Sequence, residues 1–103
     1  MYGYNGTLLV IDVSNRSWCW KGIHPRVLRQ FLGGTGLAAY LLYKHCPAGI
    51  DAFDSRNPIV FCASPLVGTK LTTSSKFAVA TKSPLTGFIG DSLSSSHLAV
   101  SIK

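Results

Sequence analysis

Acidic residues are scarce in this sequence: among 103 residues there are four aspartates and no glutamate. The sequence therefore shows no paired carboxylates for acid–base catalysis, and a lone carboxylate is a poor site for a divalent cation. Ten lysines and arginines against these four aspartates give a net charge of +6, a balance that attracts anions such as phosphate. Because the basic residues are scattered along the chain, we expect no nucleic acid as a partner.

Cysteines and long apolar runs are also few. Cys19, Cys46 and Cys62 are widely separated and form no CxxC pair, so they indicate neither a disulfide framework nor a metal site. Cys19 and Cys62 lie in apolar runs, where a free cysteine is expected to be buried, and this usage is typical of a reducing cytoplasm. The N-terminus lacks the basic and apolar regions of a signal peptide, and no apolar stretch approaches the roughly 18 residues of a membrane span. We therefore expect a cytoplasmic protein without a membrane span.

The first half of the chain predicts a hairpin followed by two helices. Residues 7–13 are rich in β-forming residues, and residues 17–23 alternate around two tryptophans, so a turn between them joins two strands. A proline suits the first position of a helix over residues 25–32. The glycine pair that follows ends this helix, and Thr35 is placed to cap a second helix running to about residue 45.

The second half predicts strands over residues 59–63 and 76–82, with turns that contain proline and glycine. A polar cluster at residues 92–96 then leads into a helix near His97, which a serine caps. No signal for the end of this helix follows, so the chain as a whole, residues 1–103, is interpreted as a single partial domain of the α+β class.

A glycine pattern at residues 34–39 matches GxGxxA, and Asp54 lies near the distance expected for a ribose-binding acid. A dinucleotide fingerprint needs a strand immediately before the glycines, whereas residues 25–32 predict a helix. The glycines are better explained as a junction between two helices.

Lys76 is the most promising charged residue, because it follows four hydroxyl-bearing residues at the start of a strand. A lysine beside hydroxyl groups can hold a phosphate as a point charge, although a solvated lysine at a strand end is the simpler alternative. Lys82 lies on the same side of the strand but roughly 20 Å away at about 3.3 Å per residue, so the two cannot hold one phosphate. The serines before His97 either cap a helix or bind an anion, and His97 itself could reach a ligand.

Four segments, in order along the chain, resemble the N-terminal domain of aldehyde ferredoxin oxidoreductases. They are Met1-Tyr2-Gly3-Tyr4-Asn5-Gly6, Phe31-Leu32-Gly33-Gly34-Thr35-Gly36-Leu37-Ala38, Ser64-Pro65-Leu66-Val67-Gly68-Thr69 and Thr81-Lys82-Ser83-Pro84-Leu85-Thr86-Gly87-Phe88-Ile89. The resemblance covers essentially the whole chain. It implies an α+β fold with a mixed β-sheet and flanking helices, of which this chain is the first half.

The resemblance further implies a tungsten, or sometimes molybdenum, held by two pyranopterins whose phosphates share a magnesium ion. Complete members oxidise aldehydes to carboxylic acids and pass electrons through a [4Fe–4S] cluster to ferredoxin, and this domain forms the floor under the cofactor. The residue at the position of Lys76 approaches a pterin phosphate, and the segment matching Leu93, Ser94, Ser95 and Ser96 contacts the pterin and magnesium. No catalytic residue and no cluster ligand falls in this stretch, so the remainder of the enzyme or a larger subunit would supply them.

Two departures from the family pattern concern these residues. Arginine is usual at the position of Lys76, so the bidentate fork is missing and only the charge remains. An Asn-Ser-Gly-Gly type segment is replaced by residues 93–96, which points to a divergent branch. The alternative is a non-catalytic subunit or a truncated remnant that keeps the fold and binds no metal.

Overall fold

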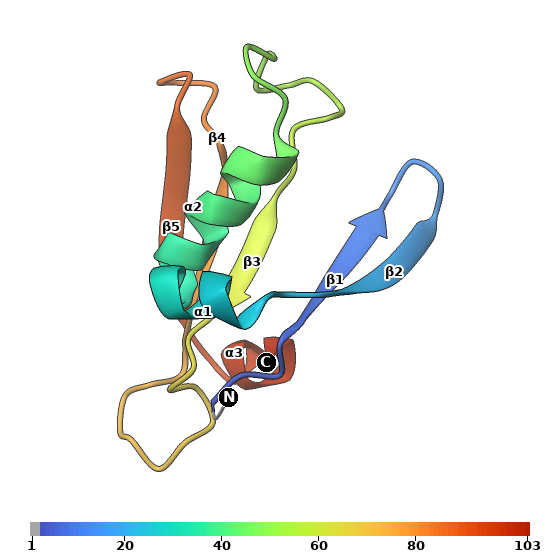
Figure 1. The fold of residues 1–103 in the computed structure, drawn as a ribbon. Helices are drawn as coiled ribbons and strands as arrows, with labels where there is room; N and C mark the ends of the chain where they lie inside the picture. Colours follow the sequence, from blue (N-terminus) through green and yellow to red (C-terminus); the bar gives the residue numbers. More distant parts are fainter. Residues whose placement is uncertain (1–2) are drawn as a thin grey trace.

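The computed structural model describes residues 3–103, so the first two residues of the opening segment, Met1 and Tyr2, lie outside the described residues. A hairpin is followed by two helices, a three-stranded sheet and a last short helix (Figure 1). The elements are β1 (Thr7–Asp12), β2 (Ser17–Gly22), α1 (Pro25–Phe31), α2 (Gly34–His45), β3 (Val60–Ala63), β4 (Lys76–Lys82), β5 (Ile89–Ser95) and α3 (Leu98–Ile102). The predicted α+β class is confirmed.

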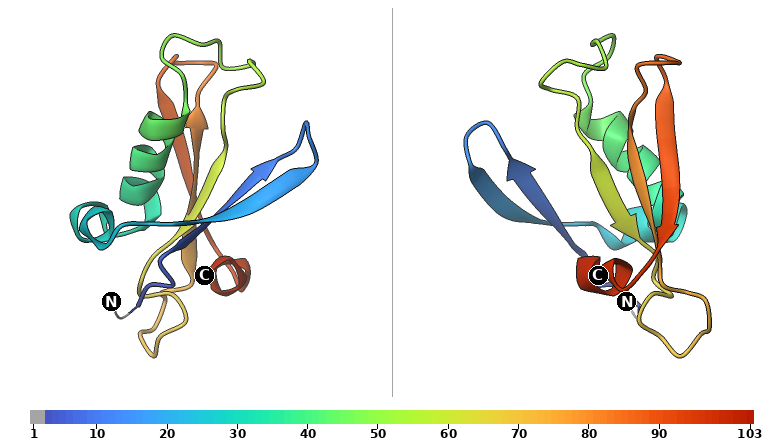
Figure 2. Two further views of the ribbon diagram at one scale, coloured as in Figure 1. Left: turned by 45° about the vertical axis from the view of Figure 1, so that its right-hand side comes forward. Right: turned by 180° about the vertical axis from the view of Figure 1, so that it is seen from behind.

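The predicted hairpin is present, with β1 and β2 paired antiparallel from Thr7↔Gly22 to Asp12↔Ser17. Asp12 forms its turn, because one carboxylate oxygen accepts hydrogen bonds from the backbone N–H groups of Ser14 and Asn15. The hairpin projects away from the sheet and α2 in every view (Figures 1 and 2). Cys19 is therefore exposed, and the prediction that it is buried was wrong.

The two helices follow the predicted pattern, with one correction at their junction. Pro25 begins α1, and His24 Nδ1 accepts a hydrogen bond of 3.0 Å from the backbone N–H of Arg26. The predicted cap Thr35 was wrong, because the N-cap of α2 lies two residues earlier, at Gly33, which has no side chain to form a capping hydrogen bond. An α-helix rather than a strand precedes the GxGxxA pattern, which agrees with the rejection of a dinucleotide site.

β3, β4 and β5 form an antiparallel sheet with β4 in the centre. All strand pairs within residues 3–103 are antiparallel, so any parallel pair of the expected mixed sheet is not formed among these residues. α2 covers one face of the sheet (Figure 2), and Leu37 and Leu41 of α2 pack with Cys62 and Ala80 of the strands. At the other face α3 is held through Ala99, which packs with Phe77 and Val67.

β5 was not predicted. The polar residues that were expected to lead directly into a helix instead pair with β4, from Lys76↔Ser95 to Lys82↔Ile89. The predicted last helix is present as α3, but its N-cap is His97, which makes no side-chain capping hydrogen bond, so the predicted serine cap was wrong. Ser96, one residue earlier, accepts through its Oγ a hydrogen bond of 3.1 Å from the backbone N–H of Leu98. Among the described residues, no helix has both the length and the apolar character that a membrane crossing requires.

Candidate functional site

A broad open hollow of about 530 Å³ lies where β4 begins and β5 ends. Three of the predicted site residues meet there, because the register places Lys76 opposite Ser95, and Ser96 follows directly. The hollow is lined by Thr73, Ser75, Lys76, Ser95, Ser96 and His97. It lies at the end of the sheet nearest α3 and the loop that precedes β4 (Figure 1).

Local hydrogen bonds shape the loop that carries Lys76. The Ser74 hydroxyl donates to the carbonyl of Leu71 at 2.9 Å, and the backbone N–H of Lys76 donates to the carbonyl of Ser74 at 2.8 Å. Thr73 has a φ of 57°, which a β-branched residue rarely adopts. The Ser96 N–H donates to the carbonyl of Ser75 at 3.1 Å, which ties the loop to the end of β5. The two segments that line the hollow are thus joined directly.

Several polar groups of the hollow have no hydrogen-bond partner within residues 3–103. They are the Lys76 ammonium, the hydroxyls of Ser75 and Ser95, and the imidazole of His97. The Thr73 hydroxyl, in contrast, donates to the carbonyl of Thr72 at 2.7 Å. No aspartate lines the hollow, and the ion pair found among the described residues joins Arg56 and Asp54 elsewhere. Free donors and a lysine without a carboxylate partner fit an anion.

Two of the predicted site residues do not line this hollow. Leu93, two residues before Ser95 in β5, pairs with Ala78, and its side chain is largely exposed. Ser94 pairs with Phe77 and therefore lies on the opposite face of the sheet from Lys76. This alternation follows from the strand conformation of β5, which the sequence reasoning did not foresee.

The sequence reasoning also missed Thr73 and Ser75 as lining residues, and it gave His97 only as a residue that could reach a ligand. The hydroxyl-rich run before Lys76 was a usable signal for the first two. The place of His97 could not be read from the sequence, because the pairing of β4 with β5 brings residue 97 beside residue 76.

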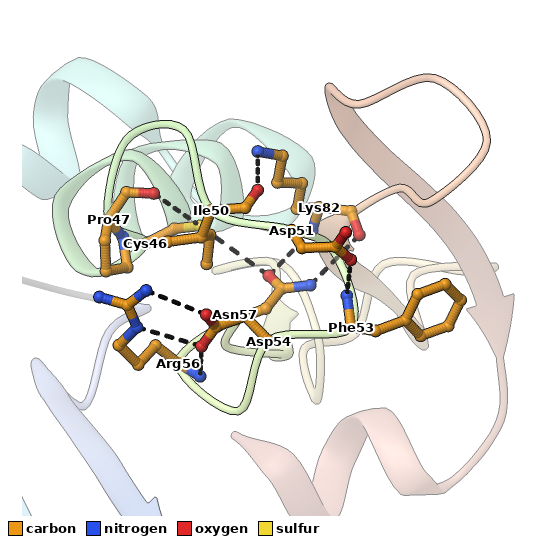
Figure 3. Close-up of polar contacts among 9 residues, drawn as sticks. All are labelled: Cys46, Pro47, Ile50, Asp51, Phe53, Asp54, Arg56, Asn57 and Lys82. Atoms are coloured by element: carbon orange, nitrogen blue, oxygen red, sulfur yellow. Dashed lines mark hydrogen bonds and ion pairs between the residues drawn. The ribbon is translucent and has the colours of Figure 1, made fainter.

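Lys82, at the other end of β4, has a structural partner. Its ammonium donates to the carbonyl of Ile50 in the loop between α2 and β3 (Figure 3). Asn57 reinforces this contact, because its side-chain nitrogen donates to the carbonyls of Ala52 and Lys82 at 2.8 and 3.3 Å. A smaller hollow of about 260 Å³ lies beside them, lined by Ile50, Asp51, Ala52, Phe53, Lys82, Ser83, Pro84 and Gly87. Lys82 thus holds a loop, a role that the sequence did not predict.

The cysteines do not form a redox or metal site within the described residues. No group of three His, Cys or Asp side chains that could hold a metal ion occurs among residues 3–103. Cys62 is buried, as predicted, and this burial raises the pKa of its thiol to about 11. A thiol with so high a pKa is a poor nucleophile near neutral pH.

Comparison with known proteins places these observations in a family. The chain matches the family described as "Aldehyde ferredoxin oxidoreductase, N-terminal domain" over residues 8–103. It is 32% identical to the tungsten-containing aldehyde ferredoxin oxidoreductase of Pyrococcus horikoshii and 33% identical to that of Pyrococcus furiosus, each over 103 residues. It is 30% identical to a protein of P. furiosus named "Aliphatic sulfonate oxidoreductase, WOR-like subunit". Each match takes in the whole of this chain, which spans 17% of the length of these relatives.

A solved structure has the same fold. The chain is similar to the active-site complex BamBC of benzoyl coenzyme A reductase, determined in complex with 1,5-dienoyl-CoA. The TM-score is 0.85 at 30% identity, and the match covers 89% of this chain and 14% of the other. The arrangement of hairpin, helices and sheet described above is therefore one that this group of enzymes uses.

Proposed function

Because this chain belongs to the aldehyde ferredoxin oxidoreductase family, we propose that it is the opening part of a tungsten- or molybdenum-bispyranopterin oxidoreductase. The complete enzyme oxidises an aldehyde to a carboxylic acid: water supplies the oxygen atom, two protons are released, and ferredoxin accepts the two electrons. An aldehyde is the proposed substrate because the two relatives from P. horikoshii and P. furiosus carry that activity in their names. This segment forms part of the floor that holds the pterin phosphates and their magnesium ion, and the remainder of the enzyme or a larger subunit carries the [4Fe–4S] cluster.

The observation that supports this role is the meeting of Lys76, Ser95 and Ser96 at one hollow. A phosphate monoester needs donors and positive charge and is repelled by carboxylates, and the lining supplies the first two and contains no aspartate. The hollow is open, so a large cofactor could be bound with its phosphate at the floor and its ring system outside. The residues present therefore fit a pterin phosphate.

The work of this chain is to bind and orient. Lys76 acts as a compact point charge, since a lysine lacks the bidentate fork of an arginine. Ser95 and Ser96 come from the end of a paired strand, so their backbone is fixed before the ligand arrives. Leu93 can offer only its backbone carbonyl, and Ser94 is proposed as a contact from the family resemblance alone. When bound, the metal centre supplies the oxygen-atom and electron transfer.

The test is to measure tungsten, molybdenum and iron by plasma mass spectrometry in the protein purified from its own source and in variants of it. Lys76→Ala should lower the ratio of tungsten or molybdenum to protein, because a charge-assisted contact to phosphate contributes on the order of tenfold or more to retention. Lys76→Arg should retain the metal. Lys70→Ala is the matched control, because Lys70 is also exposed but lies outside the hollow.

Two outcomes would contradict the proposal. Unchanged metal content in an intact Lys76→Ala enzyme would refute the phosphate role of Lys76. Folded wild-type protein that carries neither tungsten nor molybdenum would instead support the alternative, a non-catalytic subunit or remnant that kept the fold.

A further inference from the structure

We infer that His97 and Ser75 are ligands of the same phosphate group as Lys76 and Ser95, and that they supply the additional hydrogen bonds that an arginine at position 76 would donate. This inference rests on the proposed function for the nature of the cofactor, but the site itself is argued from geometry. Its ligand class is a phosphate monoester. Neither His97 nor Ser75 is among the residues that the family resemblance assigns to the cofactor.

His97 has a free side chain on a fixed backbone. Its carbonyl accepts hydrogen bonds from the N–H groups of Val100 and Ser101, at 3.0 and 3.2 Å, in the turn of α3. α3 is held in place by Ala99, which is fully buried against Val67 and Phe77. The imidazole itself makes no hydrogen bond to any group of residues 3–103 and lines the hollow. Fixing the backbone in advance lowers the entropic cost of binding a ligand through the ring.

Ser75 approaches from the other side. Its carbonyl is tied to the N–H of Ser96 at 3.1 Å, and the residue is partly buried, while its hydroxyl has no partner within the described residues. The loop and β5 therefore present donors from two directions. Ser75 and Lys76 lie at the end of the loop and the start of β4, and Ser95 and His97 lie at the end of β5 and in the turn that follows it. A phosphate offers several oxygens, so donors from two sides can each reach a different one.

The charge balance favours the same assignment. The lining contains one lysine and one histidine, and the four aspartates of the chain are all absent from it. Lys76 carries its three N–H donors on one nitrogen, so it approaches a phosphate from one side only, and oxygens on the other sides are open to other donors. An imidazole N–H and a serine hydroxyl are groups that supply such bonds. The side chains required to complete a lysine-centred phosphate site are thus those that the register brings beside it.

The experiment follows the binding of inorganic phosphate to the full chain by ¹H–¹⁵N NMR at constant ionic strength, with chloride as the balancing anion. Saturable shifts are expected at residues 73–76 and 95–97. His97→Ala and Ser75→Ala should each raise the dissociation constant for phosphate about tenfold, because each variant removes one hydrogen bond to a charged group. His45→Ala is the control, since His45 is exposed on α2 away from the hollow.

A loss of folding can be told apart from a loss of binding, because His97→Leu removes both ring nitrogens with little change of size and the amide spectrum reports the fold directly. Phosphate that binds at the hollow with the same affinity in the His97 and Ser75 variants would overturn the inference. Non-saturable shifts spread over the basic residues would overturn it as well.

The inference and the proposed function fail in different ways. Tungsten in the purified enzyme, together with phosphate binding that ignores His97, would leave the function standing and remove the inference. Phosphate binding that depends on His97, in a protein that carries neither tungsten nor molybdenum, would support the inference and contradict the proposed function.

Discussion

Lys76 and Lys82 stand on the same face of β4, at its two ends. The ammonium of Lys82 is bound to the carbonyl of Ile50, 32 positions earlier in the chain, whereas that of Lys76 has no partner within residues 3–103. A lysine with a backbone partner holds a loop, and a lysine without one is available to a ligand. The sequence indicated that the two could not share a phosphate, but not which of them would be free.

The Asp54–Arg56 pair leads to a prediction about pH. The Arg56 side chain donates two hydrogen bonds to the carboxylate of Asp54, and its backbone N–H donates a third (Figure 3). The side-chain hydrogen bonds, then the backbone one, lower the pKa of Asp54 from 3.8 to about 2. Because the folded-state pKa lies below the unfolded one, the stability that this carboxylate contributes is fully present above about pH 4 and is lost as the pH falls toward 2.

Arg56→Ala should therefore raise the pKa of Asp54 toward its ordinary value. The measurement is an NMR titration of the Asp54 side-chain carboxyl in both proteins. Asp12 serves as an internal reference, since its turn on the hairpin does not involve Arg56. A titration of Asp54 that is identical with and without Arg56 would contradict the assignment.

At the scale of elements, the junction between α1 and α2 depends on glycines for close packing. A Cβ atom added at Gly36 would lie 2.7 Å from the carbonyl oxygen of Phe31, and one added at Gly33 would lie 2.9 Å from that of Ala63. Real Cβ atoms do not approach backbone oxygens so closely, and neither oxygen can move without shifting its element. The glycines that resemble a dinucleotide fingerprint are therefore required by the packing of helices and sheet.

Gly36→Ala should destabilise the chain by about 1–3 kcal/mol, because overpacking against backbone outweighs the gain of about 1 kcal/mol from the better helix propensity of alanine. Urea denaturation at low protein concentration measures the change. Gly22→Ala is the control, because no atom lies within 4 Å of the Cβ position there. A Gly36→Ala chain as stable as the wild type would show that the junction can relax.

Local sequence patterns predicted most of the helices and strands, and they failed where pairing with a neighbouring strand decided the conformation. The hairpin, the first two helices and the central strand β4 follow from alternation, proline and glycine placement, and helical spacing. β5 contains a glycine, an aspartate and several serines, residue types that do not favour strands, yet it pairs with β4 over its full length. Tertiary pairing overrode propensity there, and the same error hid the place of His97 in the site.

At the scale of the whole molecule, the exposed surface is large. A compact protein of 11.1 kDa exposes roughly 5,700 Å² by the usual scaling. This chain exposes 7429 Å², about a third more than that scaling gives. The projecting hairpin (Figure 2) contributes to this excess, and one of its faces is apolar. The residues of this apolar hairpin face are Leu9, Ile11, Val13, Trp18 and Trp20, which are between 42% and 82% exposed.

The apolar hairpin face predicts that the chain alone associates with itself at rising concentration. Leu9 lies opposite Trp20 and Ile11 opposite Trp18, and the two indole rings meet edge to face at 6.4 Å, so the face is continuous. Burying one such aromatic side chain contributes about 1.5–3 kcal/mol, so two indoles are enough to drive weak association.

Sedimentation equilibrium should show a mass that increases with concentration. The double variant Trp18→Ser, Trp20→Ser should shift this association to at least about tenfold higher concentration. The double variant Phe53→Ser, Leu85→Ser removes two apolar side chains from loops that are even more exposed, at 85% and 92%, and should leave the association unchanged. If both double variants act alike, association depends on the total apolar surface rather than on the hairpin. A wild-type chain that stays monomeric at millimolar concentration would show that the apolar hairpin face does not drive self-association.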